Sequence, residues 1–396
     1  MRIVLFTGKG GVGKSTVAAG TAALAAARGS RTLVLSTDAA HSLADAFGVE
    51  VGPEPTRVAP DLFVQQVDAQ LRLEQSWAGI QAYLLEVLHL AGLDPVTAEE
   101  LTVVPGAEEV LALLELRHHV LSGEWDAVVV DCAPTAETLR LLALPEALGW
   151  YLRRVLPTEG RAVRALAPLL TRAAGVPLPD VDVVGAAERL CAELAEVHAL
   201  LTGPEAGVRL VLTPEAVVLA EARRSWTSLS LFGYRVDGVV ANRVFPATPG
   251  DPWREGWARA QQQVLTEVEA SFAGLPVWRS SYAAAEPVGA PALRALAEEL
   301  YAGADPLPAP TASAPFRVVR TADGATLHLA LPLATRDEVD LARSGDELVV
   351  TVGSYRRVLA LPGVLARLEV RGAAVEDGEL RVRFRAARER ATAAAR

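Results

Sequence analysis

The sequence predicts a doubly wound α/β domain with a mostly parallel sheet and helical insertions, followed by a small all-β sandwich. Short, continuous apolar runs recur through roughly the first 280 residues, as expected of strands buried on both faces of a parallel sheet. Helical patterns separate these runs, and such alternation is typical of a doubly wound fold. After a Pro-rich stretch the pattern changes to short strands with turn signals, which predicts the sandwich.

The expected strands of the α/β domain are a series of apolar runs. They are Ile3–Phe6, Thr32–Leu35, Phe63–Val67, Ala127–Val130, Val208–Leu212 and Gly238–Ala241. The first helix is expected over Ser15–Arg28, because Gly29 follows it as a terminator. Two helical insertions are expected at 71–122 and 138–201, where apolar residues recur at helical spacing.

The segment Ala302–Pro315 is rich in Pro, Ala and Ser, which indicates a stiff linker between domains. We therefore expect an α/β domain over 1–302 that includes the helical insertions, a linker over 303–315, a sandwich over 316–386 and a tail over 387–396. The expected sandwich strands are Phe316–Arg320, Thr326–Leu331, Glu347–Val352, Tyr355–Leu361, Ala366–Arg371 and Glu379–Phe384.

Composition excludes several classes of protein. The net charge of −10 disfavours a protein that coats nucleic acid, which needs a basic surface. No apolar run of 18 residues is free of charge, so no membrane span is expected. A strand pattern begins at Arg2 and leaves no room for a signal peptide, which favours a cytoplasmic location. The only cysteines are Cys132 and Cys191, so neither a disulfide framework nor a zinc site is expected.

A glycine-rich loop follows the first expected strand and opens the first expected helix. Its residues fit the phosphate-loop pattern G-x-x-x-x-G-K-[ST], which a coincidental glycine-rich turn in this context would rarely match. The loop and its first helical residues are Gly8, Lys9, Gly10, Gly11, Val12, Gly13, Lys14, Ser15 and Thr16. Backbone N–H groups and the helix N-terminus of such a loop bind phosphate. We expect Lys14 to reach the β- and γ-phosphates and Ser15 to bind Mg²⁺.

The second lysine of the loop, Lys9, lies outside the general pattern. The chain has 38 lysine and arginine residues, and only Lys9 and Lys14 are lysine. A compact ammonium fits beside phosphate where a planar guanidinium would crowd the backbone, so a solvated loop lysine is the less favoured interpretation. A lysine directly after the first glycine resembles the deviant Walker A loop of dimeric ATPases. That resemblance implies a homodimer in which Lys9 contacts the nucleotide of the partner.

Two further segments narrow the resemblance. Ser36–Phe47, with the sequence STDAAHSLADAF, follows the second expected strand, and Asp131–Arg140, with the sequence DCAPTAETLR, follows the fourth. Together with the loop they resemble the ArsA family, which comprises arsenite-pump and tail-anchored-protein targeting ATPases. Weaker similarities extend the match over residues 1 to 302. The resemblance implies binding of ATP and Mg²⁺ and hydrolysis of ATP.

The resemblance also implies roles for single residues. Asp38 would orient the attacking water and act in catalysis with Lys14 and Lys9, since phosphoryl transfer depends on positioning and charge neutralisation. Asp131 would hold Mg²⁺ through water and begin a switch with Pro134, Thr135 and Ala136 that senses the γ-phosphate. Asn242 and Arg243 would contact the nucleotide base. The alternative roles are a helix N-cap for Asp38 and turn residues for Asp131 and Asn242.

The sequence departs from the family in several ways. It lacks the clustered cysteines of the arsenite pumps and the zinc-binding CxxC of eukaryotic targeting members. Cys132 and Cys191 are expected to be buried structural thiols rather than ligands of an iron–sulfur cluster. Ala136 stands where a glycine usually follows the switch threonine, which would stiffen the sensor.

The C-terminal sandwich resembles the α-crystallin domain of small heat-shock proteins. The matching stretches are Leu331–Val339, Gly345–Val352, Arg356–Pro362 and Asp377–Val382. The long N-terminal arm and the I-x-I tail of those proteins are missing. An interaction or packing module and an inert structural appendage remain open as its role.

The function favoured by these features is an ATP-driven homodimeric switch that handles an apolar client segment, such as part of a membrane protein. The apolar helical insertions motivate this interpretation, with ordinary core helices as the alternative. A second hypothesis is the catalytic subunit of an arsenite or oxyanion efflux pump. A third, a partitioning ATPase that acts on DNA or a membrane surface, is disfavoured by the acidic charge.

Overall fold

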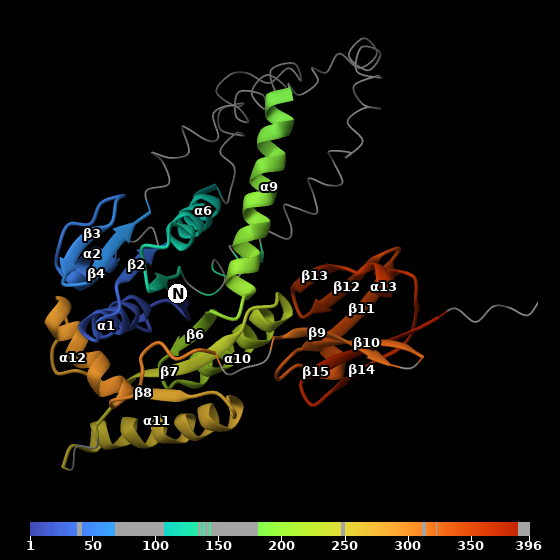
Figure 1. Cartoon of the computed structure of the whole chain (residues 1–396). Coiled ribbons are helices and arrows are strands. Elements are labelled where there is room, and N and C mark those ends of the chain that lie inside the picture. Colours follow the sequence, from blue (N-terminus) through green and yellow to red (C-terminus); the bar gives the residue numbers. More distant parts are fainter. Residues whose placement is uncertain are drawn as a thin grey trace, which may run out of the picture. The chain divides into compact units, whose positions relative to one another are not determined.

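The computed structural model describes residues 1–37, 42–67, 107–133, 135, 138, 142–143, 181–246, 250–310, 314–321 and 323–386 (Figure 1). The chain divides into two compact units. Unit 1 comprises Met1–Ala206 and Ala283–Ala309, and unit 2 comprises Gly207–Tyr282 and Pro310–Arg396. The domain boundaries expected from the sequence stay a prediction.

The predicted fold class is confirmed, because the structure contains a mostly parallel sheet of eight strands and two smaller antiparallel sheets. In unit 1 the strand order is β3 (Thr56–Ala59), β4 (Leu62–Gln66), β2 (Thr32–Ser36), β5 (Ala127–Asp131) and β1 (Arg2–Thr7). The sheet also contains β6 (Ala206–Leu212), β7 (Val236–Val244) and β8 (Val277–Ser281), which pair in parallel in this order. Among the strand pairings described for this sheet, only that of β3 is antiparallel, and β3 forms one edge.

Every expected strand of this sheet is present, but β3 and β8 were not predicted from the sequence. Both lie at edges of the sheet, and neither has the continuous apolar run of a strand buried on both faces. By contrast, β1, β2 and β5 are buried along their whole length.

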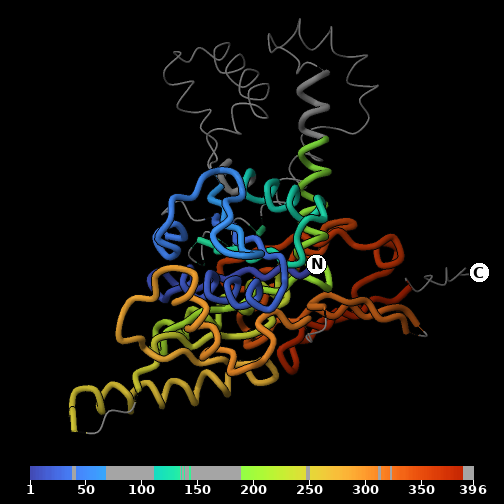
Figure 2. Tube along the Cα trace, turned by 60° about the vertical axis from the view of Figure 1, so that its left-hand side comes forward, coloured from blue at the N-terminus to red at the C-terminus, as the bar shows by residue number. Residues whose placement is uncertain are grey.

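Helix α1 (Lys14–Ala27) is fixed against α12 (Ala290–Tyr301), and Figures 1 and 2 show the two helices side by side. The backbones approach so closely that a Cβ on Gly20 would lie 2.8 Å from the carbonyl oxygen of Leu293. The hydroxyls of Thr21 and Tyr301 form a buried hydrogen bond of 2.8 Å. This packing holds the helix that follows the phosphate loop.

The described ends of the two helical insertions pack together. They are α6 (Ala107–Ser122) and α9 (Val181–Thr202), which lie side by side in Figure 1 and contact each other. Arg117 of α6 and Glu196 of α9 form an ion pair of 2.6 Å. The rest of the predicted insertions lies outside the described residues. Among the described helices, none is long and apolar enough to cross a membrane.

The sandwich has two antiparallel sheets. One has the order β14 (Glu369–Glu376), β15 (Glu379–Arg385), β10 (Gly324–Ala330) and β9 (Phe316–Thr321), and the other has β11 (Val339–Ser344), β12 (Glu347–Val352) and β13 (Tyr355–Ala360). The sequence analysis missed β11. The strand expected over Ala366–Arg371 is present only from Glu369, where β14 begins, because Gly363–Ala366 forms the short helix α13.

The sandwich packs on a helix within unit 2. That helix is α10 (Ala216–Leu231), whose Leu231 belongs to the same buried apolar cluster as the sandwich core. The Thr227 hydroxyl donates to the carbonyl of Pro332, and the buried guanidinium of Arg357 donates to the carbonyl of Leu231. These contacts favour a sandwich that packs on the rest of unit 2 over a sandwich that makes no contact with it.

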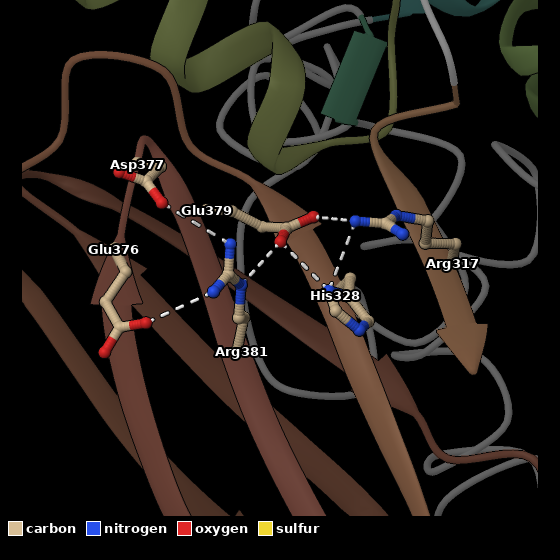
Figure 3. Close-up of polar contacts among 6 residues, drawn as sticks. All are labelled: Arg317, His328, Glu376, Asp377, Glu379 and Arg381. Atoms are coloured by element: carbon tan, nitrogen blue, oxygen red, sulfur yellow. Dashed lines mark hydrogen bonds and ion pairs between the residues drawn. The ribbon is translucent and has the colours of Figure 1, made fainter. Parts of the chain in front are cut away.

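A network of charged side chains crosses the four-stranded sheet of the sandwich (Figure 3). The carboxylate of Glu379 on β15 accepts hydrogen bonds from Arg381 at 2.8 Å and from Arg317 on β9 at 2.5 Å. It also lies 2.9 Å from Nδ1 of His328 on β10. Partial burial raises the pKa of Glu379, but the hydrogen bonds from Arg381, His328 and Arg317 outweigh this effect and lower the pKa to about 2.

We expect Glu379 to stabilise the folded sandwich above pH 4.5 and to lose this effect as the pH falls toward 2. Because its pKa is lower in the folded state than the ordinary glutamate pKa of 4.5, acid protonates the unfolded chain first. The full contribution is at most about 3 kcal/mol. Urea unfolding of wild type and Glu379→Gln at pH 7 and pH 3 should show a gap in stability that narrows at pH 3.

Glu376→Gln is the matched control, because the Glu376 side chain is 60% exposed on the neighbouring strand and pairs only with Arg381 in the described structure. It should cost less stability at pH 7 than Glu379→Gln does. An equal gap for Glu379→Gln at both pH values would contradict the assigned role of the carboxylate.

Candidate phosphate-loop site

The phosphate loop lies between β1, which ends at Thr7, and α1, which begins at Lys14. Gly11 and Gly13 have φ values of 80° and 90°, a left-handed conformation that other residues rarely adopt. Gly13 occupies the N-cap position of α1 without a capping side chain, and no acidic residue lies in the first turn. The helix N-terminus therefore keeps backbone donors and positive potential for an anion.

The surroundings of the loop leave room for a ligand close to the backbone. A Cβ placed on Gly10 or Gly11 would meet no atom within 4 Å. A phosphate group can approach the amides there, which is the chemistry predicted for this loop.

The two lysines differ in their surroundings. Lys14 is only 6% exposed, and its ammonium lies 3.5 Å from the carbonyl oxygen of Lys9. That long contact to a neutral group is its one hydrogen bond among the described residues. The half-buried Lys9 thus touches Lys14 through its backbone, and no described residue forms an ion pair or hydrogen bond with the Lys9 ammonium.

The end of β5 lies beside the loop. Asp131 is fully buried and stands opposite Phe6 in the parallel pairing of β1 and β5. After β5 the chain returns to the loop, since the N–H of Thr135 donates to the carbonyl of Gly8 at 3.3 Å. The Thr135 hydroxyl is buried and has no hydrogen-bond partner among the described residues. A buried, orphaned hydroxyl at this point fits a site that a polar ligand completes.

The comparisons with known proteins agree with this geometry. Residues 1–302 match the family described as anion-transporting ATPase, and residues 322–384 match an HSP20-like domain found in ArsA. The chain belongs to the ArsA ATPase family. A putative arsenical pump-driving ATPase of Chlorobaculum tepidum is 36% identical over 388 residues, which cover 97% of this chain and 96% of the relative.

Two other relatives show how far the similarity extends. Putative arsenical pump-driving ATPase 1 of Aquifex aeolicus is 32% identical over 394 residues, covering 96% of this chain and 99% of its own. The ATPase ASNA1 homolog of Entamoeba dispar is 25% identical over 325 residues, which cover 76% of this chain and 94% of the relative. Both resemblances drawn from the sequence are confirmed, and the chain is an enzyme that hydrolyses ATP.

In this ArsA-family ATPase, the structure brings together the phosphate loop, Asp131 and Thr135 within unit 1. Within the loop, Val12 is buried, while Ser15 and Thr16 are half-buried in the first turn of α1. Three predicted site residues, Asp38, Pro134 and Ala136, lie outside the described residues, so their roles stay predictions.

The predicted base-contacting residues belong to unit 2. Asn242 is buried near the end of β7. Arg243 follows it with an exposed side chain and a φ of 56°, and its carbonyl accepts a hydrogen bond of 3.1 Å from Gln261. A non-glycine residue in the left-handed region indicates a constrained backbone at this point. Their contact with a nucleotide stays a prediction.

The residues of the loop fit a magnesium nucleotide. The described residues contain no group of three or more His, Cys, Asp and Glu that would hold a metal by itself. Mg²⁺ in nucleotide sites does not need such a group, because phosphate oxygens and water supply most of its ligands. Ser15 would supply a hydroxyl ligand, and the buried Asp131 at the end of β5 would act through water. Cys132 is buried as expected, whereas Cys191 is only half-buried, and neither forms a disulfide bond with a described residue.

Two hydroxyls near the loop did not emerge as site residues from the sequence. The hydroxyl of Ser42 lies 2.9 Å from that of Ser15. The hydroxyl of Thr7, at the end of β1, is buried without a partner among the described residues. Ser42 falls inside the segment that carries the family resemblance, but no spacing rule brings together two serines that are 27 positions apart.

Proposed function

We propose that this ATPase is a cytoplasmic, Mg²⁺-dependent homodimeric switch that couples ATP binding and hydrolysis to the handling of an apolar client segment. The homodimer part of the proposal rests on the surroundings of Lys9. Its ammonium has no ion-pair or hydrogen-bond partner among the described residues, although it belongs to the loop that is proposed to bind the phosphates. A cation that the described residues of its own chain leave without a partner can neutralise charge on the nucleotide of a second chain.

The helical insertions support the client part of the proposal. One insertion precedes β5 in the sequence and the other follows it. Strand β5 ends at Asp131, the first residue of the proposed switch. Their described ends, α6 and α9, contact each other and are tied by the Arg117–Glu196 pair. A change at the switch would therefore reach both insertions together, and their apolar sequences suit an apolar segment.

A second candidate is the ATPase subunit of an arsenite or oxyanion pump. The names of the relatives from Chlorobaculum tepidum and Aquifex aeolicus favour it, as does the description of the family. Against it, the chain has only two cysteines for a metalloid that binds thiols.

A peptide-binding experiment separates the candidates. The Asp38→Asn protein, which should bind ATP without hydrolysing it, is mixed with a labelled apolar helical peptide of about 20 residues. We expect binding in ATP and weaker binding in ADP, and no binding of a control peptide with two central arginines. Equal binding of both peptides, or none in either nucleotide, would contradict client handling. Severalfold stimulation of wild-type hydrolysis by arsenite would favour the pump.

A further inference from the structure

The hydroxyls of Ser15 and Ser42 join the phosphate loop to the helix that follows β2. Ser15 is the second residue of α1, and Ser42 is the first residue of α2 (Ser42–Phe47). Their oxygens are 2.9 Å apart, and either can donate the hydrogen. Helix α2 is held in place, because Leu43 and Phe47 are buried and the helix contacts α1. The packing of α2 thus fixes the position of Ser42.

The chemistry of a hydroxyl makes this contact asymmetric once a cation binds. A serine hydroxyl has one hydrogen to donate and two lone pairs that accept. When Ser15 gives a lone pair to a cation, its hydrogen must point away from the positive charge and find an acceptor. Among the described residues, Ser42 is the hydrogen-bond partner of this hydroxyl. Ser42 would then accept, and the Ser15 lone pair would face the cation.

We propose that Ser42 is a positioning residue for the metal: its oxygen accepts the hydrogen of Ser15 and so orients Ser15 as a ligand. This inference rests on the proposed Mg²⁺-nucleotide site and goes beyond it. It also gives α2 a link to the metal, because Ser42 follows Asp38 by only four residues, a span of at most about 14 Å. Ser42 would therefore connect the metal ligand Ser15 to the segment of sequence that carries the residue proposed to orient water.

The test measures metal binding separately from turnover. Mn²⁺ replaces Mg²⁺ as a probe, and its binding to the ADP-loaded protein is followed by electron paramagnetic resonance. Ser42→Ala should bind Mn²⁺ roughly three- to tenfold more weakly, since one hydrogen bond to a ligand is lost. ADP affinity in the presence of a chelator should not change. Ser42→Thr, which keeps the hydroxyl, should restore Mn²⁺ binding.

Two further variants keep the test decisive. Ser30→Ala removes a hydroxyl from the turn after α1, at the opposite end of that helix from Ser15, and should bind Mn²⁺ like wild type. Ser42→Cys preserves side-chain size with a weaker acceptor, and replaces Ser42→Ala if that protein melts at a lower temperature. Mn²⁺ affinity within twofold of wild type in the folded variant would overturn the role of Ser42. Failure of wild type to bind Mn²⁺ with ADP would instead overturn the proposed site itself.

Discussion

Replacement of Lys14 by alanine should lower the rate of ATP hydrolysis by a factor of about a hundred or more. The Lys14 ammonium is confined beside the loop backbone, with 6% of the residue exposed, and among the described residues its one hydrogen bond is the long contact to the Lys9 carbonyl. Phosphate oxygens would be far stronger partners for this charge than a neutral carbonyl. The Lys14 ammonium would stabilise charge on the transferred phosphoryl group in the transition state. Loss of this ammonium should therefore affect the rate of hydrolysis more than it affects folding. Steady-state hydrolysis at saturating ATP measures the change.

The matched control is Arg28→Ala, which removes a cation from the opposite end of α1. Arg28 hydrogen-bonds to the carbonyl of Ala304 in an exposed position and takes no part in the loop. Its variant should keep the wild-type rate within about twofold, since surface contacts of this kind contribute little. A Lys14→Ala enzyme that retained a tenth of the wild-type rate with unchanged melting temperature would contradict the assigned role.

Sequence reasoning succeeded where local pattern and burial agree. The strands β1, β2 and β5 are buried along their whole length and are apolar except at terminal residues, because both faces of the central sheet are covered, so each appears as a continuous apolar run. The phosphate loop was predictable for a similar reason. Its glycines, lysine and serine are adjacent in sequence, and the conformation of Gly11 and Gly13 follows from residue type.

The structural features that were not predicted from the sequence depend on contacts between distant segments. Strand β8 has a half-exposed, partly polar sequence and is defined by its pairing with β7. Likewise, the sandwich is attached to α10 by Thr227 and Arg357, whose partners are backbone carbonyls that no side-chain pattern reveals. The Ser15–Ser42 contact belongs to the same class, because it arises only when α1 and α2 pack.

The second large effect is expected for Lys9→Ala, which should reduce hydrolysis by about a hundredfold in the dimer. Because its ammonium has no partner among the described residues, its loss should leave the fold intact. Nucleotide affinity of the monomer should change little, since the Lys14 side chain and the loop backbone remain. Lys9→Arg should also be impaired, as a planar guanidinium does not replace a compact ammonium beside phosphate. Wild-type hydrolysis by Lys9→Ala would remove the basis for the cross-dimer role.

Mixing two inactive variants shows whether Lys9 acts on the nucleotide of the partner chain or on the nucleotide of its own chain. In a dimer of one Lys9→Ala chain and one Lys14→Ala chain, the first chain keeps its own Lys14 and receives Lys9 from the second. If Lys9 crosses the interface, that one site is complete, and an equal mixture after subunit exchange should recover about a quarter of the wild-type rate, because half of the dimers are mixed and each has one working site. If Lys9 serves its own chain, each site lacks one lysine and no activity returns. Exchange is confirmed independently with two affinity tags, so that recovered activity supports the cross-dimer role and its absence in proven mixed dimers contradicts it.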